Sequence, residues 1–186
     1  MKTILFGSAL AALFAAGACA ADAPAPGIGK LLDGQIKSIE SEIVSLAEAM
    51  PADKYDFAPT AGEFKDARTF GQQMSHVAAV LYMVSAAALG EKNPSEAGPG
   101  ENGPATIHGK DAIVQYLKDS FAYAHKAAAN ITMANVMDPV PSAFGSSKTP
   151  RLSMISVAVS HSFDHYGQAV IYARMNGIIP PASRPR

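Results

Sequence analysis

The stretch that determines the fold is TPRLSMISVAVSHSFDHYGQAVIYARMNGIIPP, residues 149–181. Thr149 is a favourable N-cap residue, and Pro150 suits the first helical turn, where its missing N–H has no helical partner in any case. At the other end, an Asn-Gly pair at 176–177 favours a left-handed stop, and the two prolines at 180–181 prevent the helix from continuing. The stretch therefore predicts one long helix whose two ends are both encoded in the sequence.

Two histidines, His161 and His165, lie in this predicted helix four residues apart. On an α-helix this spacing corresponds to about 40° of rotation and one turn of rise, so both imidazoles leave the same face. Gln168 and Tyr172 continue that face. Two imidazoles on one helical turn supply half of a metal site, and the remaining ligands must come from another segment.

Apolar residues spaced three and four apart predict three further helices upstream, over about residues 29–50, 69–90 and 110–132. Thr69 and a glutamine three residues later have the spacing of a capping box at the start of the second one. The residues that form the four apolar stripes are Leu32, Ile36, Ile39, Ile43, Leu46 and Met50; Phe70, Met74, Val77, Leu81, Val84 and Ala88; Val114, Leu117, Phe121, Ala124, Ala128 and Ile131; and Leu152, Ile155, Val159, Ser162, Tyr166, Ala169 and Ala173.

Four amphipathic helices with no strand-like alternation predict an all-α protein, a four-helix bundle. The connections between the helices are long, about 18 residues each, whereas antiparallel neighbours need only a few. A connector of this length can span up to about 60 Å, and a helix of about 20 residues is only about 30 Å long. At least one connection is therefore expected to run the length of the bundle, which allows two successive helices to be parallel.

Composition supports a single globular domain. The chain has 186 residues, of which 48% are hydrophobic, and it contains no tryptophan, so its core must be mainly aliphatic. A formal net charge of −1 and the absence of a basic run argue against a nucleic-acid partner.

The N-terminus resembles an export signal rather than a part of the fold. Residues 1–20 contain an early lysine, a short apolar run and an Ala-Cys-Ala cleavage signal, which predicts a signal peptide. The expected organisation is a signal peptide (1–20), a flexible linker (21–28), the bundle (29–181) and a C-terminal tail (182–186). The mature domain is then periplasmic or extracellular. The alternative makes Cys19 a lipidated first residue, and only in that case is a membrane a partner.

A third histidine, His76, lies midway along the predicted helix 69–90, one position off its apolar stripe. His161 and His165 likewise lie just off the apolar stripe of their own helix. Three neutral imidazoles would form a tripod for a divalent ion and leave coordination positions open, as catalytic sites do. The alternative is an exposed pair, His161 and His165, that binds nothing. His108 and His125 are interpreted as ordinary surface or boundary residues.

Other chemistries have little support. Cleavage after Ala20 leaves no cysteine for thiol catalysis, and the sequence contains neither a glycine-rich phosphate loop after a strand nor a His-Glu-x-x-His motif. Asp164 is expected on a solvated face. Gln168 and Tyr172 are packing residues unless they assist a bound ion.

Three segments in this order resemble the DinB family: Lys-Tyr-Asp-Phe-Ala-Pro (54–59), Arg-Thr-Phe-Gly-Gln-Gln-Met-Ser-His (68–76), and His-x-x-x-His-x-x-Gln-x-x-x-Tyr-x-Arg-x-x-Gly-Ile-x-Pro-Pro (161–181). The likeness covers about residues 29–181. It implies a four-helix bundle with an unusual crossover and a three-histidine metal site. The family's positions for that site fall on His76, His161 and His165 here.

The resemblance also implies functions. Some relatives transfer the thiols bacillithiol or mycothiol, and others are described as metal-dependent hydrolases without a known substrate. Because those thiols are cytosolic, the export signal makes thiol S-transfer the less favoured expectation. The long connector 91–109 has no family pattern and is a candidate rim for the pocket.

The sequence therefore predicts an exported enzyme of the hydrolase type that depends on a divalent ion (Zn, Ni, Mn or Fe) and acts on a small-molecule substrate. Tyr55, Gln168 and Tyr172 are the candidates for orienting that substrate or a bound water. The alternative is a non-enzymatic metal- or ligand-binding module of the cell envelope. The oligomeric state is left open, and a homodimer is among the alternatives.

Overall fold

The computed structural model describes residues 27–185. The predicted signal peptide, Cys19 and most of the predicted linker lie outside the described residues. The elements are, in chain order, α1 (Ile28–Ala49), η1 (Ala52–Lys54), α2 (Phe70–Leu89), η2 (Pro99–Glu101), α3 (Lys110–Ala129), β1 (Pro139–Pro141), β2 (Lys148–Pro150), α4 (Arg151–Met175) and η3 (Pro181–Ser183). The predicted all-α bundle is confirmed, with a two-stranded hairpin as an addition that no sequence pattern indicated.

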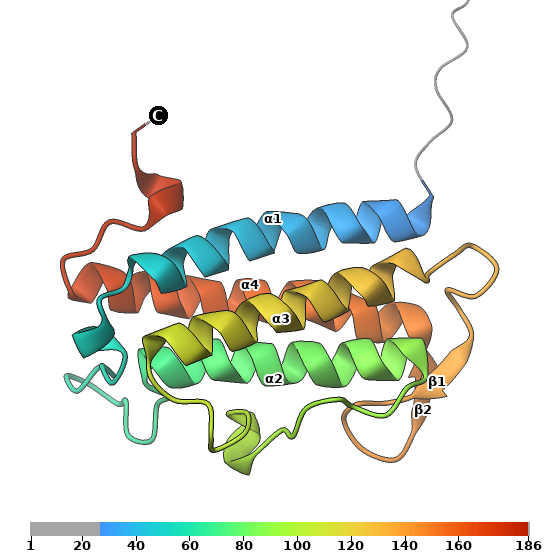
Figure 1. Ribbon diagram of the computed structural model, residues 1–186, viewed down its shortest axis with the longest axis horizontal. Helices are drawn as coiled ribbons and strands as arrows, with labels where there is room; N and C mark the ends of the chain where they lie inside the picture. The colour runs from blue at the N-terminus through green and yellow to red at the C-terminus, as the bar shows by residue number, and fades with distance from the viewer. Residues whose placement is uncertain (1–26, 186) are drawn as a thin grey trace, which may run out of the picture.

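Each long helix packs against two others (Figure 1). Both α1 and α2 contact α3 and α4, so the pairs α1/α2 and α3/α4 lie diagonally across the bundle. In Figure 1, α2 and α3 run in the same direction, and the connection between them returns along the bundle from the end of α2 to the start of α3. This connection is the predicted lengthwise crossover.

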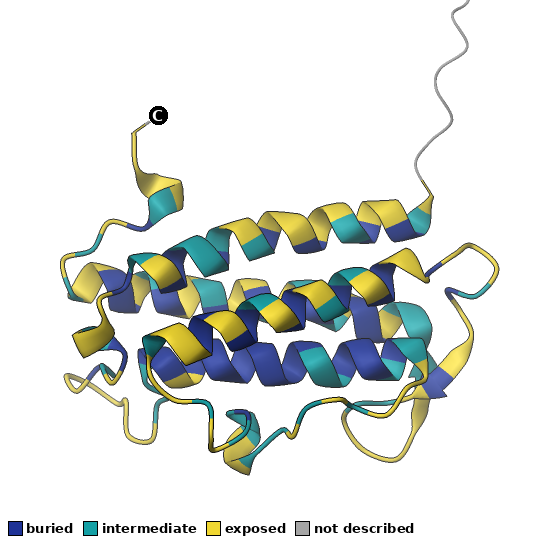
Figure 2. Cartoon of the chain, viewed as in Figure 1, coloured by how far each residue is buried: buried dark blue, intermediate teal, exposed yellow. Residues whose placement is uncertain are grey.

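The core forms where the apolar stripes meet. The largest fully buried side chains include Phe70, Phe121, Ile36 and Ile155. The helix α2 differs from the expected single stripe, because most of its residues are buried all round its axis (Figure 2). Its neighbours α3 and α4 and the crossover segment together account for this burial. Within residues 27–185, no helix combines the length and apolar character needed to cross a membrane.

The start of α2 is fixed as predicted. Thr69 and Gln72 form a reciprocal capping box, in which the Gln72 N–H donates to the Thr69 hydroxyl over 3.2 Å and the Thr69 N–H donates to the Gln72 amide oxygen over 2.9 Å. The first helical N–H groups, of Phe70 and Gly71, donate to the carbonyls of Phe57 and Tyr55. The segment before α2 therefore completes the hydrogen bonding of its N-terminus.

The start of α4 differs from the prediction. Thr149 does not cap the helix, because it pairs with Val140 in the β1–β2 hairpin, and Pro150 occupies the N-cap position without a side-chain bond. The first two N–H groups of α4 instead donate to the carbonyls of Asp138 and Val136, each over 2.9 Å. A tertiary hairpin thus replaces the local cap that the sequence suggested.

The C-terminal end of α4 is confirmed, and the end of α3 is shorter than expected. Gly177 has φ of 73°, and the N–H of Ile178 returns to the Ala173 carbonyl over 2.9 Å, which is the bond of a Schellman-type stop. The helix α3 ends at Ala129 rather than near residue 132, since Asn130 is its C-cap and bonds the Lys126 carbonyl through its side chain. The predicted tail begins within η3.

Candidate metal centre

Three histidines from two helices converge at one point in the bundle. His76 comes from α2, and His161 and His165 come from successive turns of α4. One ring nitrogen from each lies within 4.8 Å of the others, and the ring centroids are 4.4, 4.7 and 4.9 Å apart. The structure therefore brings together the three residues that the sequence singled out.

In two of these histidines, His76 and His165, the Nδ1 atom has a hydrogen-bond acceptor. His76 Nδ1 lies 2.9 Å from the carbonyl oxygen of Glu101, and His165 Nδ1 contacts the amide oxygen of Gln73. Because a carbonyl oxygen can only accept, both Nδ1 atoms carry the proton and donate it. Both Nε2 atoms are then left with a lone pair, the arrangement that metal-binding histidines use.

The third histidine faces the first. His161 Nε2 lies 3.1 Å from His76 Nε2, and His161 Nδ1 is buried without a hydrogen-bond partner among the described residues. No protein group therefore fixes the tautomer of His161. With metal–nitrogen bonds of about 2.0–2.1 Å, two imidazole nitrogens on one ion are separated by about 2.9 Å at an octahedral angle and about 3.3 Å at a tetrahedral one. The observed His76–His161 separation falls in this interval, so this pair fits a divalent ion that accepts imidazole, and a ring nitrogen of His165 lies within 4.8 Å of both.

The environment keeps these imidazoles neutral, which is the form that binds a metal. Burial lowers the pKa of His161 to about 3, and the neighbouring His165 and His76 act in the same direction. Burial likewise lowers the pKa of His165 to about 4, and His76 adds to the effect. The pKa of His76 itself is lowered by burial, against the opposing influence of its bond to the Glu101 carbonyl.

A chain of side-chain hydrogen bonds runs from His165 Nδ1 to the protein surface. Gln73 accepts from His165 and donates through Nε2 to the Gln168 amide oxygen over 3.1 Å. Gln168 in turn donates to the Asp164 carboxylate over 3.2 Å. Gln168, expected as a candidate near the ion, therefore acts on the site through Gln73, and Asp164 forms the exposed end of the chain.

The crossover connection reaches the histidines through a tight turn at residues 98–103. Glu101 has φ of 58°, in the left-handed region that non-glycine residues rarely adopt. A Cβ on Gly98 would lie 1.8 Å from the Gly103 carbonyl oxygen, so this close approach requires glycine. The Arg68 guanidinium holds the turn by donating to the Gly100 carbonyl over 2.8 Å and to the Asn102 side-chain oxygen over 2.9 Å. The turn thereby presents the Glu101 carbonyl to His76.

The two tyrosine candidates have their hydroxyls occupied by backbone carbonyls. Tyr55 donates to the Ala47 carbonyl over 2.7 Å, and burial raises its pKa well above the ordinary value. It lines a surface pocket of about 520 Å³ that also contains His108 and none of the three clustered histidines. Tyr172 donates to the Arg68 carbonyl over 3.2 Å. Neither hydroxyl contacts a clustered imidazole in the part of the chain that the structure describes.

A second pocket, of about 470 Å³, is lined by none of the three clustered histidines but includes Gln73, which contacts His165. Its wall includes Gln73 and Gln168, the amide pair behind His165, together with Arg68 and Tyr172. The cluster and this pocket therefore share Gln73 as a common boundary.

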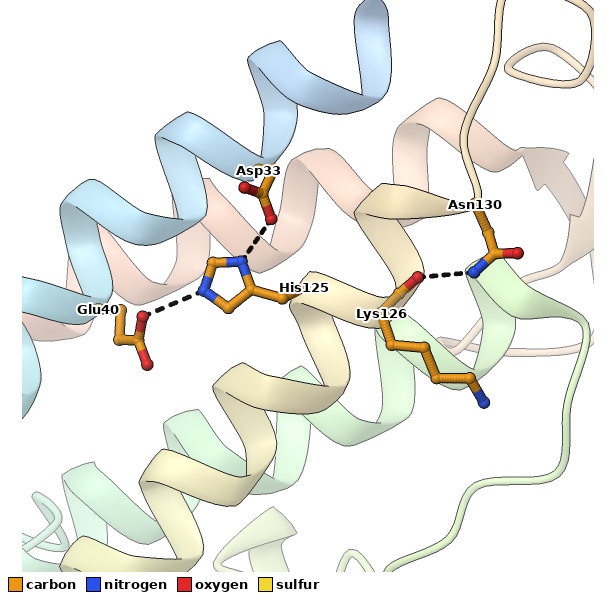
Figure 3. A network of polar contacts seen from close by, with 5 residues as sticks. All are labelled: Asp33, Glu40, His125, Lys126 and Asn130. Atoms are coloured by element: carbon orange, nitrogen blue, oxygen red, sulfur yellow. Dashed lines mark hydrogen bonds and ion pairs between the residues drawn. The ribbon is translucent and has the colours of Figure 1, made fainter.

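The remaining histidine on a helix, His125, belongs to a different kind of site (Figure 3). Its Nδ1 lies 2.6 Å from a carboxylate oxygen of Asp33, and its Nε2 lies 3.1 Å from one of Glu40. Burial lowers the pKa of His125, but the hydrogen bonds with Glu40 and Asp33 outweigh this and raise it overall. The protonated ring thus links α3 to α1 as an ion pair, and it lies outside the candidate metal centre.

Three contributors to the site were not assigned from the sequence. In the sequence, Gln73 and Arg68 appear only as members of the family pattern at residues 68–76. Glu101 acts through its backbone carbonyl, which no side-chain pattern can reveal.

Comparisons with known proteins agree with this architecture. The sequence pattern of the DinB superfamily matches residues 35–169. A crystal structure of a DinB-like protein from Bacillus cereus ATCC 10987 superposes with a TM-score of 0.62 at 13% identity, covering 80% of this chain and 95% of the other. One of a DinB-like protein from Bacillus subtilis gives 0.59 at 15% identity, with coverages of 84% and 99%. No curated protein sequence matches the chain significantly. Because the matched pattern covers most of its length, the chain belongs to the DinB superfamily.

Proposed function

We propose that this protein is an exported enzyme of the hydrolase type that uses a divalent metal ion, held by His76, His161 and His165, to act on a small-molecule substrate. The observation that carries the proposal is the convergence of three neutral imidazoles, two of which have their Nδ1 protons fixed on Glu101 and Gln73. Zn²⁺, Ni²⁺, Mn²⁺ and Fe²⁺ all accept imidazole ligands.

Such an ion, when bound, lowers the pKa of a coordinated water and polarises a substrate carbonyl. The chain's own contribution is to orient the imidazoles and to leave coordination positions open. The Glu101 carbonyl holds one ring from the crossover turn, and the Gln73–Gln168 pair holds another from within the bundle. The pocket next to Gln73 supplies room for a substrate.

A second candidate is a non-enzymatic metal-binding module of the cell envelope. It is favoured by the hydroxyls of Tyr55 and Tyr172, which both bond to backbone carbonyls and so are not free to move a proton in this arrangement. Thiol S-transfer is a third activity that the same substrate screen would detect.

The test is elemental analysis of protein purified from its own periplasm, followed by a screen of simple esters, amides and thiol conjugates. We expect about one equivalent of a transition metal and turnover of at least one substrate class. The matched control is His161→Ala, which should lose both metal and turnover. Metal without turnover would favour the binding module, and absence of metal from freshly isolated protein would contradict both.

Export is part of the proposal and has its own measurement. The intact mass of material recovered outside the cytoplasm should correspond to a chain that begins at Ala21. A diacylglyceryl mass on Cys19 would instead place the domain on a membrane surface through a lipid anchor, and an unprocessed N-terminus would contradict export.

A further inference from the structure

The outer face of α4 carries a solvent-exposed stripe with the spacing of a helix-packing seam. Its residues follow one another at alternating intervals of four and three, and all are exposed: Ser160, Asp164, Gly167, Ile171 and Arg174. This alternation is the repeat by which one helix packs along another in a coiled coil. Because all five residues are exposed, no described segment of the chain packs over this seam.

Large apolar side chains are concentrated on the same face. Ile171 is 55% exposed, and Phe163 (40%) and Met175 (52%) flank the seam on opposite sides. Beside Ile171, the exposed Phe64 lines the same surface pocket. Four of the nine exposed large apolar side chains in the described part of the chain thus lie on or next to this face, which is typical of an interaction surface.

Gly167 leaves a notch in the middle of the seam. A glycine inside a helix destabilises it relative to alanine. No described residue requires this glycine, because a Cβ at its position would meet nothing within 4 Å. The notch lies one turn from the protruding Ile171, and a second helix that carries the same two residues can fill it.

Two opposite charges, Asp164 and Arg174, lie on either side of the Gly167–Ile171 pair. Neither forms an ion pair among the described residues, and their side-chain hydrogen bonds are with the uncharged Gln168 and Ser183. A carboxylate can accept, and a guanidinium can donate, several further hydrogen bonds. Both groups can therefore pair with a partner molecule.

The positions of these four residues determine which partner fits. The midpoint between Asp164 and Arg174 along the helix is also the midpoint between Gly167 and Ile171. If a second copy packs antiparallel about a two-fold axis at this point, Asp164 faces the partner's Arg174 and Gly167 faces the partner's Ile171. A parallel two-fold arrangement would instead place like charges opposite each other and Ile171 against the partner's Ile171. The sequence of the seam therefore favours the antiparallel pair.

The remaining charges beside the seam do not oppose this association. The pocket wall next to Ile171 contains one acidic and one basic residue, Asp66 and Arg68. Together with Asp164 and Arg174, they give the face as many positive as negative charges.

We propose that the outer face of α4 docks a second copy of this chain, with the two α4 helices antiparallel around a two-fold axis midway between Gly167 and Ile171. Each Ile171 then fills the notch at the partner's Gly167, and two Asp164–Arg174 pairs lie at the ends of the seam. This association goes beyond the proposed function and requires no bound metal. Because Gln168 and Ile171 also line the pocket of about 470 Å³, the partner's α4 lies beside that pocket.

The first test measures the oligomeric state of the mature chain by sedimentation equilibrium. We expect the parent to be dimeric at tens of micromolar and Ile171→Arg to dissociate at least about tenfold more readily, since it places a charge at the centre of the seam. The matched control is Leu31→Arg, because Leu31 lies on α1 and is 52% exposed. A monomeric parent, or equal effects of the two substitutions, would overturn the proposal.

The second test addresses the antiparallel register by reversing charges, at low ionic strength, where exposed pairs are least screened. Asp164→Arg and Arg174→Asp each place like charges opposite each other twice in a dimer, so each should weaken association at least about tenfold. An equimolar mixture of the two variants restores both opposite-charge pairs, as does the double variant, and both should associate like the parent. Circular dichroism checks that each variant is folded. Weakening by the single changes without recovery in the mixture or the double variant, or no weakening at all, would overturn the register.

Discussion

Two histidine sites in one bundle have opposite environments. At the cluster of His76, His161 and His165, the rings face one another, their hydrogen-bond acceptors are neutral amide or carbonyl oxygens, and burial lowers their pKa values. At His125, both ring nitrogens face carboxylates on α1, and the pKa is raised. The same side chain is thus kept neutral in one place and favoured as a cation in the other.

The comparison indicates that acceptor type, rather than burial alone, distinguishes the candidate metal site from the ion pair. A carbonyl acceptor fixes the proton on Nδ1 and leaves Nε2 as a ligand, whereas two carboxylates occupy both nitrogens and favour the doubly protonated ring. Four predictions follow this contrast from its largest expected effect to its smallest.

Removing any member of the cluster should have the largest effect. His76→Ala, His161→Ala and His165→Ala each leave two imidazoles, and we expect metal affinity to fall by at least about 10–100-fold, the loss typical of removing even an outer-sphere partner. His108→Ala and His125→Ala should bind metal like the parent. Titration calorimetry on the five variants tests this, and unchanged affinity in His76→Ala would reduce the site to a histidine pair.

Acid should destabilise the metal-free protein through the cluster. The folded-state pKa values of about 3 for His161 and about 4 for His165 lie below the value of about 6.5 expected in the unfolded chain. Below about pH 6.5 the unfolded chain therefore binds more protons, and the free energy of unfolding should decrease as the pH falls, by about 2 kcal/mol or more between pH 7 and 4.5. Urea denaturation at the two pH values measures this change in the free energy of unfolding. The double variant His161→Gln/His165→Gln is the control, and an equally steep pH dependence in that variant would assign the effect to other groups.

Removing the amide acceptor of His165, on Gln73, should have an intermediate effect on metal affinity. Gln73→Leu leaves His165 Nδ1 without its amide partner and breaks the connection to Gln168, so metal affinity should fall by about tenfold. Gln115→Leu, at an exposed glutamine of α3, is the matched control. Calorimetric affinities that are the same for both variants would show that the amide chain does not orient the ligand.

The His125 ion pair should contribute least and with the opposite pH dependence. Its folded-state pKa is raised, so its contribution to stability is present below the unfolded value of about 6.5 and is lost as the pH rises through the folded one. Because the pair is partly exposed, His125→Gln should lower the free energy of unfolding by about 0.5–1 kcal/mol at pH 5.5 and by less at pH 8.5. Denaturation of parent and variant at both values tests this, and equal losses would indicate a packing role.

Local sequence signals predicted the features that depend on local chemistry. The sequence predicted the capping box at Thr69, the left-handed stop at Gly177 and the apolar stripes, because each involves residues within one or two helical turns. The length of the connectors likewise predicted the crossover. The histidine pair on α4 was evident from its spacing, His76 was put forward as its partner from its position one residue off an apolar stripe, and the family pattern supported that choice.

Features that depend on distant segments were not predictable from the sequence. Thr149 has the chemistry of a cap, but its pairing with Val140 takes it into a hairpin. The bond from His76 to Glu101 uses a backbone carbonyl placed by a left-handed turn. The partners of His125 lie 92 and 85 residues away from it in the chain, and no periodicity connects them.

The contact between His76 and His161 joins positions 85 residues apart, in a bundle whose described residues include no cysteine. An ion shared by these two side chains would act as a cross-link between α2 and α4. A permanent link closing a loop of this length would remove about 4.6 kcal/mol of chain entropy from the unfolded state. A metal link can dissociate when the chain unfolds, so it would instead stabilise the folded state by mass action, to an extent that increases with the free metal concentration. The stability of the folded bundle would then depend on the metal content of its compartment, whereas the stability of a disulfide-linked domain depends on redox potential.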